Sequence, residues 1–225
     1  VNDYAVQVVI KDLERLGHKR IILKNDQDPA VMALRTPVKA RCNVEIVPEE
    51  SPVYESASNG EIESTIRTIQ DQIRTFKDAL ECRIGARLDK EENVVTWMVT
   101  HAAETANRYH MPAAKGYTAY ERWKGRKFRR DMVEFGECVL YKTPGMKGKD
   151  NMEVRWEDGI FLGVNDTSGE IRIGTSEGVM MARDMRRKAR DEDRWQADKV
   201  HGIIGVPWDM RPSSRVDMSV NVPTG

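Results

Sequence analysis

The 225-residue chain has few cysteines, no long apolar run and no net charge, and each of these absences excludes a class of protein. The three cysteines, Cys42, Cys82 and Cys138, lack the CxxC or HxxxH spacing of structural zinc sites, which favours reduced thiols. No apolar stretch is long enough to cross a bilayer, and the start of the chain does not resemble a signal peptide. Lys plus Arg equals Asp plus Glu at 36 each, so any affinity for nucleic acid must come from local clusters.

The first part of the chain alternates predicted helices with predicted strands. Apolar residues between 4 and 16 recur at steps of three and four, which predicts a helix that ends at Gly17. A β-branched run follows at 20–24. Asp28 and Pro29 suit the N-cap and first turn of a second helix to about Ala40, before a strand over 43–47. This order predicts an α/β layer with parallel strands, and we expect the sequence to begin inside a domain.

A polar loop over 48–60 precedes two further predicted helices. The first carries an apolar stripe that must face a core or a partner, formed by Ile62, Ile66, Ile69, Ile73, Phe76 and Leu80. The second spans about 92–109 and contains His101, which we interpret as structural. From Phe135 the pattern changes to short strands over 138–142, 159–164, 170–174 and 178–183. Short strands at close spacing predict a small β-barrel.

Two carboxylates form a candidate metal site. Asp26 follows the first predicted strand, and Glu63 lies in the first turn of the long helix, with 36 residues between them. Mg²⁺ prefers oxygen ligands, and two-metal phosphoryl transfer needs carboxylates that converge from different elements. Such pairs also arise by chance, so a helix-capping aspartate and a solvated glutamate remain the alternative.

Several short strings occur in one order and resemble a known family. They are LKNDQDPA at 23–30, SP at 51–52, SNGEIE at 58–63, TAYER at 118–122 followed by GR at 125–126, and GIFLG at 159–163. Over about residues 5–208 they resemble the copia-type integrase of retrotransposon Pol polyproteins. One departure is Asp26-Gln27-Asp28, where many members of the family have Asp-Asn-Gly.

The resemblance implies an α/β fold in which a partial RNase H-like domain, its early strands missing, precedes a small SH3-like barrel. The implied parts are 1–125 for the catalytic core, 126–134 for a basic linker, 135–205 for the barrel and 206–225 for a flexible tail. It also implies DNA integration by 3′-end processing and strand transfer, with Asp26 and Glu63 as catalytic ligands of Mg²⁺ or Mn²⁺. The family's first catalytic aspartate lies before the first helix, and Asp3 is too close to that helix to replace it. We therefore expect this piece to be inactive alone.

The implied partners are element ends and target DNA, within a homo-oligomer that acts in the nucleus and not at a membrane. In the family, residues one and two turns beyond the catalytic glutamate approach DNA, and here these are Arg67 and Gln70. Arg74 and Lys77 continue the same face of the helix. An ordinary solvated face with supporting charge pairs is the alternative.

Two basic clusters are further candidates for DNA contact. Residues 115–130 contain Lys124, Arg126 and Lys127 among seven cations, with aromatic residues interleaved. Residues 183–190 contain five cations and one acid. Such clusters neutralise phosphates, although the first also fits a solvated linker whose aromatic residues pack in a core.

Two other functions stay open from the sequence. One is a non-catalytic DNA-binding or structural remnant of a transposon polyprotein. The other is a protein-interaction module built on the barrel over about 135–190, for which the sequence provides no evident aromatic cage.

Overall fold

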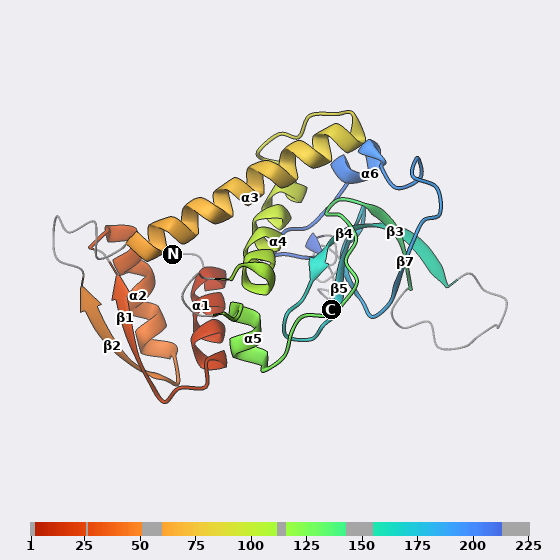
Figure 1. Ribbon diagram of the computed structural model, residues 1–225. Coiled ribbons are helices and arrows are strands. Elements are labelled where there is room, and N and C mark those ends of the chain that lie inside the picture. The colour runs from red at the N-terminus through yellow and green to blue at the C-terminus, as the bar shows by residue number, and fades with distance from the viewer. Residues whose placement is uncertain (1–2, 26, 51–59, 112–115, 143–154, 213–225) are drawn as a thin grey trace, which may run out of the picture. The chain divides into compact units, whose positions relative to one another are not determined.

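The computed structural model describes residues 3–25, 27–50, 60–111, 116–142 and 155–212 (Figure 1). These residues form a mixed α/β protein, as the sequence predicts. They divide into two compact units, Val1–Thr68 and Ile69–Gly225, which are described separately. Within the described ranges, no helix is both long enough and apolar enough to span a membrane.

The first unit is a β–α–β arrangement preceded by a helix. Its elements are α1 (Asp3–Arg15), β1 (Arg20–Asn25), α2 (Pro29–Arg41) and β2 (Glu45–Glu50). The strands pair in parallel, with Arg20 opposite Glu45, and α2 makes the crossover between them. The apolar faces of the helices and strands meet in a small core around Val6, Ile10, Val38 and Ile46.

Local sequence signals explain where α2 begins. The Asp28 carboxylate accepts hydrogen bonds from the backbone N–H groups of Ala30 at 2.8 Å and Val31 at 3.4 Å. Pro29 occupies the first helical position, where its missing N–H costs nothing. The predicted cap is therefore confirmed, whereas β2 lies at 45–50 and not at 43–47 as expected.

The long helix α3 (Gly60–Ile84) contains the division between the two units. In its second half, Ile73, Phe76 and Leu80 pack in the core of the second unit. In its first half, Ile62 and Ile66 are 64% and 50% exposed. The apolar stripe therefore faces a core in its second half, and a partner for its first half stays a prediction.

The second unit combines helices with a five-stranded antiparallel sheet (Figure 1). Its further elements are α4 (Asn93–Tyr109), α5 (Ala119–Lys124), β3 (Cys138–Lys142), β4 (Trp156–Val164), β5 (Ile171–Thr175), β6 (Gly178–Ala182), β7 (Met185–Arg187) and α6 (Ala197–His201). The strand order is β6-β5-β4-β3-β7, so four strands follow one another as hairpins and the fifth returns beside β3. The sequence predicted the first four strands, with β4 starting three residues later than observed, and missed β7.

Both faces of this sheet are buried, because alternate side chains enter two different cores. Ile160 and Leu162 pack with Trp97 of α4 and the other residues of one apolar cluster, whereas Phe161 and Val164 belong to a second cluster. The sheet and α4 therefore share a core, although the sequence suggested a boundary between them near 126–134. The domain boundaries 1–125, 126–134, 135–205 and 206–225 stay predictions.

The start of the expected tail packs against the sheet. The backbone N–H of Val179 donates to the carbonyl of Met210 at 2.7 Å, and Val206 and Asp209 form an isolated bridge. The rest of the expected tail, 213–225, lies outside the described residues.

A buried carboxylate holds the chain that leaves α3. Glu81 is 7% exposed and accepts hydrogen bonds from the backbone N–H of Leu88 at 2.8 Å, from Arg87 at 2.7 Å and from Lys77. These donors, the Leu88 N–H first, lower the pKa of Glu81 to about 2. The ionised form is therefore the form that stabilises the fold.

We predict that Glu81→Gln lowers the free energy of unfolding by about 1–3 kcal/mol at pH 7, because a buried charged acceptor is lost. The wild-type contribution is present above the carboxyl's ordinary pKa of 4.5 and disappears as the pH falls towards 2. Urea unfolding at pH 7 and pH 3 measures both effects. Glu91→Gln, at an exposed carboxylate, is the control. An equal effect of the two substitutions at pH 7 would contradict the prediction.

Candidate nucleic-acid interface

Of the two predicted metal ligands, only Glu63 is within the described residues, so their pairing stays a prediction. Asp26 lies outside them, and Glu63 is exposed in the first turn of α3. At the carboxyl ends of the paired strands, Asn25 stands opposite Glu50, and Arg35 bonds to both side chains at 3.2 and 3.3 Å. In the described ranges no three His, Cys, Asp or Glu residues are grouped as a metal site.

The predicted DNA-facing side of α3 is exposed at Glu63, Arg67, Gln70 and Arg74. Arg74 forms an ion pair with Asp71 within the helix, and Lys77 is bonded to Glu81. Arg67 is therefore the cation of this face that makes no ion pair within the described part of the chain.

The two basic clusters differ in how many of their cations form ion pairs with acids. In the cluster at 183–190, Arg187 bonds to the buried Glu137 at 2.6 Å and Lys188 to Asp158 at 2.8 Å. Arg190 pairs with Glu192 at 3.8 Å, and Arg186 stacks on the Trp156 ring at 4.5 Å. Most cations of this cluster therefore interact with acidic or aromatic side chains of the chain itself.

The other cluster, at 115–130, contains α5, a short helix with defined ends. The Thr118 hydroxyl accepts from the N–H of Glu121, and the Glu121 carboxylate accepts from the N–H of Thr118, at 3.1 and 2.8 Å. This capping box fixes the start of the helix. Gly125, with φ at +67°, ends it in a left-handed conformation that favours glycine. The chain then continues without helix or strand through 126–134.

Residues 124–130 form one wall of a cleft of about 350 Å³, which we name the basic cleft. The other wall is the β4–β5 turn at 164–169, and Tyr120 also lines the space. Arg126, Lys127 and Arg129 are exposed along it and make no ion pair within the described ranges. The Lys124 ammonium lies 3.8 Å from the centre of the Trp123 ring. The structure therefore places the predicted Lys124, Arg126 and Lys127 together in one concave surface.

The turn opposite these cations is tightly hydrogen-bonded. The Asn165 side-chain oxygen accepts from the backbone N–H groups of Thr167 at 2.8 Å and Ser168 at 3.2 Å. Gly169, with φ at +72°, completes the turn. Arg130 bridges the walls, since it donates to the carbonyl of Gly169 and, at 3.1 Å, to that of Arg183.

Asp166 is the one acid that lines the basic cleft among the described residues, and a buried arginine neutralises its charge. Arg108 of α4 donates to its carboxylate through Nε at 2.8 Å and Nη2 at 2.6 Å. The side chain of Arg108 is fully buried. The accessible charge of the cleft is consequently positive.

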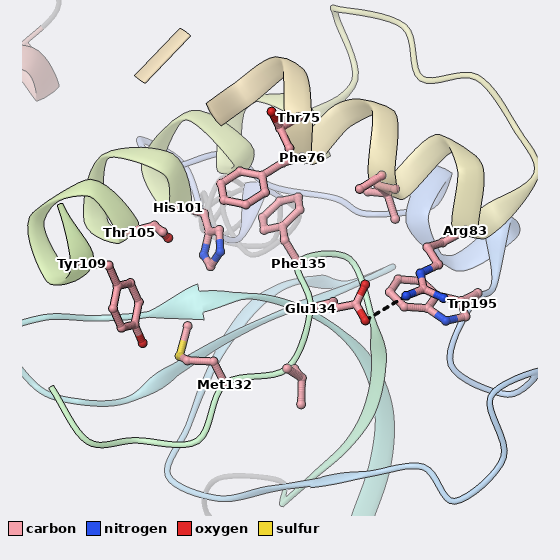
Figure 2. Close-up of a pocket in the computed structure, with 13 residues that line it drawn as sticks. Thr75, Phe76, Arg83, His101, Thr105, Tyr109, Met132, Glu134, Phe135 and Trp195 are labelled. Carbon is pink, nitrogen blue, oxygen red and sulfur yellow. Dashed lines mark hydrogen bonds and ion pairs between the residues drawn. The ribbon is translucent and has the colours of Figure 1, made fainter. Parts of the chain in front are cut away.

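A second cavity, of about 370 Å³, lies between α3, α4 and residues 132–135, and it is apolar in character (Figure 2). Figure 2 shows the His101 ring on the α4 side of this cavity, beside the rings of Phe76 and Phe135. The centroid distances to these rings are 5.2 and 5.1 Å. The cation at its rim, Arg83, is paired with Glu134 at 3.1 Å. This cavity is therefore unsuited to phosphates.

His101 is 5% exposed, in agreement with its structural interpretation. Burial lowers its pKa to about 4, and the positive charges of Arg108 and Arg172 act in the same direction. Its Nδ1 has no hydrogen-bond partner within the described part.

Sequence reasoning identified the cations of the basic cleft but missed Arg108, Asp166 and the turn at 165–169. Arg108 lies in the helix predicted over about 92–109, yet nothing in its spacing connects it with an aspartate 58 residues later.

Comparison with known proteins adds no assignment. A scan against protein-family models finds no match, and a search of curated proteins finds none either.

We predict that His101→Phe removes part of the acid sensitivity of folding. The unfolded histidine binds a proton near its ordinary pKa of 6.5, whereas the folded one resists until about 4, so wild-type stability falls as the pH drops from 6.5 to 4. Urea unfolding at pH 7 and pH 5 measures this slope. His110→Gln, at an exposed histidine, is expected to keep the slope. An unchanged slope in His101→Phe would show that the buried imidazole does not control it.

Proposed function

We propose that this chain is a DNA-binding part of a retrotransposon-type integrase and that the basic cleft holds the sugar–phosphate backbone. The observation that carries the proposal is the row of exposed cations, Arg126, Lys127 and Arg129, without acid partners along a concave surface. Lysine and arginine that neutralise phosphates release condensed counterions, which gives affinity independent of sequence. The neutral net charge of the chain makes this local excess the relevant electrostatic feature.

The topology of each unit is compatible with the finer fold proposal. A parallel β–α–β unit supports a partial RNase H-like sheet, in which β1 and β2 are two of the strands. Five short antiparallel strands, the fifth returning beside the first, support a small SH3-like barrel. In this proposal the parent protein acts on DNA in the nucleus as a homo-oligomer.

The catalytic part of the proposal concerns Asp26 and Glu63. Bound Mg²⁺ or Mn²⁺ would supply charge stabilisation at the attacking and leaving oxygens of phosphoryl transfer. Glu63 suits this role in one respect, since its side chain is exposed in the first turn of a regular helix. The described residues, which do not include Asp26, contain no group of three potential metal ligands.

A non-catalytic DNA-binding remnant is the second candidate. Its specific support is that the described lining of the basic cleft, residues 120–130 and 164–169, contains no carboxylate proposed as a metal ligand. Both candidate functions therefore include DNA binding at the basic cleft. They differ in whether Asp26 and Glu63 take part in catalysis.

We predict that the triple variant Arg126→Ala, Lys127→Ala, Arg129→Ala weakens binding to duplex DNA about 10–100-fold near 100 mM salt. The slope of log affinity against log salt should shrink by about 2–3, because each lost phosphate contact removes about 0.9. Fluorescence anisotropy with a labelled duplex of 20 base pairs, between 50 and 200 mM salt, measures both quantities.

The matched control is Arg183→Ala, Arg186→Ala, Arg190→Ala, which removes the same charge from three exposed arginines of the other cluster. It is expected to retain most of the affinity and the slope. Equal losses in the two triple variants would mean that binding follows net charge and that the cleft is not the site.

The two candidates are distinguished by a strand-transfer assay with Mg²⁺. The protein used carries this chain together with the segment that precedes it in the parent polyprotein. We predict that Glu63→Gln abolishes transfer and leaves DNA binding intact, whereas Glu61→Gln in the same helical turn retains both. Full activity of Glu63→Gln would refute the metal role. A wild type that binds DNA, transfers no strand and is not stabilised by Mg²⁺ would favour the remnant.

A further inference from the structure

Arg108 is a buried guanidinium that touches both walls of the basic cleft. Towards the turn, it donates to the Asp166 carboxylate at 2.8 and 2.6 Å and to the carbonyl of Val164. Towards the basic segment, its guanidinium carbon lies 4.6 Å from the centre of the Phe128 ring. Phe128 and Asp166 both line the cleft, and Arg108 itself is not among its lining residues.

The contacts around Arg108 fix its position. Phe128 is held edge-on by Tyr120 and Tyr109, at centroid distances of 5.4 and 6.1 Å. Glu104, one turn earlier on α4, approaches Arg108 at 3.5 Å and is itself bound at two oxygens by Arg172, at 2.8 and 2.7 Å. A buried charge paired in this way is strongly destabilising when one partner is removed.

The pairing also determines the sign of the cleft's potential. Without Arg108, the negative charge of the Asp166 carboxylate would have no cationic partner. It would then repel the negative charge of a phosphate that enters the cleft. With Arg108 in place, the exposed cations of the basic segment dominate. Arg108 does this from beneath the surface, because its buried side chain cannot reach a phosphate.

The aromatic residues of the cleft are occupied by packing. Tyr120 is 7% exposed, and Phe128 is half-buried between Arg108 and the two tyrosines. Base stacking on proteins needs exposed aromatic faces. Among the described lining residues, the cleft therefore offers charge to a backbone and no fully exposed aromatic face for the stacking of single-stranded bases.

We propose that Arg108 is a positioning residue for a duplex-backbone site. It holds the turn at 164–169 against the segment at 124–130 and cancels the charge of Asp166. This inference rests on the proposed function, since it assigns the ligand chemistry and the support of the same cleft.

The test combines Arg108→Met, Asp166→Asn and the double variant in the full chain. The probes are a duplex of 20 base pairs and the matching single strand, with binding measured against salt. We expect Arg108→Met to weaken duplex binding at least about 10-fold with an unchanged salt slope, because no phosphate contact is lost. Asp166→Asn is expected to bind as tightly as wild type or more tightly. The double variant should regain affinity relative to Arg108→Met, because the repelling carboxylate is gone.

Three outcomes would overturn the proposal. The first is wild-type duplex affinity in Arg108→Met. The second is a salt slope reduced by about one in that variant, because such a reduction indicates direct phosphate contact. The third is a double variant that binds duplex DNA no more tightly than Arg108→Met. Preference for the single strand would overturn the assignment of duplex backbone. Arg187→Met removes an arginine that pairs with the buried Glu137 at 2.6 Å and does not line the cleft, so it should lower stability without changing the affinity of the folded protein.

If Arg108→Met does not fold, Phe128→Leu tests the same support from the other wall, and it should weaken duplex binding without changing the salt slope. Wild-type binding in Phe128→Leu would then overturn the proposal.

The triple variant of Arg126, Lys127 and Arg129 distinguishes the failure of the proposed function from the failure of the positioning role. If that variant binds like wild type, the proposed function fails. If it loses affinity while the Arg108 series does not, only the positioning role fails.

Discussion

A buried guanidinium requires an acid close by, and in the second unit this requirement joins parts of the chain that are far apart in sequence. Arg108 comes from a helix, Asp166 from a hairpin turn, and Phe128 from the segment between the helices and the sheet. Desolvation makes each partner costly to leave alone. The ion pair thereby fixes the turn opposite the basic segment, and the cleft exists because these two walls keep their separation. The charge of the cleft depends on the same contact.

The antiparallel sheet provides the frame for this arrangement. Its alternating side chains enter two cores, so the β4–β5 hairpin is held from both faces. Strands with both faces buried read as nearly continuous apolar runs, as Ile160–Leu162 do. A turn on such a hairpin can carry polar residues in a fixed position, since the strands on either side cannot shift without exposing apolar surface. The turn at 165–169 is therefore a suitable place for a recognition surface.

Features that depend on neighbouring residues were accessible from the sequence. The Asp28 cap, the helix through His101 and the first four strands of the antiparallel sheet follow from local sequence patterns and were predicted. The three-residue strand β7 carries too little pattern to be recognised, and its position beside β3 depends on long-range pairing. The spacing of the apolar residues on α3 predicted which side of the helix faces a core. It did not predict how much of that side a core covers.

For the candidate site, the same limit applies to charge. The sequence identifies which residues are cationic, but it does not show which acids fold against them. Arg187 and Lys188 are neutralised by Glu137 and Asp158 from other strands or their flanks, whereas Arg126 has no such neighbour in the described ranges. Two clusters of similar composition therefore differ in accessible positive charge for a reason that lies in the tertiary structure.

The central claim is that duplex DNA lies against the basic cleft. Hydrogen–deuterium exchange of the wild-type chain, with and without a duplex of 20 base pairs at low salt, tests this without any substitution. The account predicts slower exchange in peptides covering 124–130 and 165–169 and little change in those covering 183–190. Protection confined to 183–190, or its absence from 124–130 under conditions where binding is complete, would contradict it.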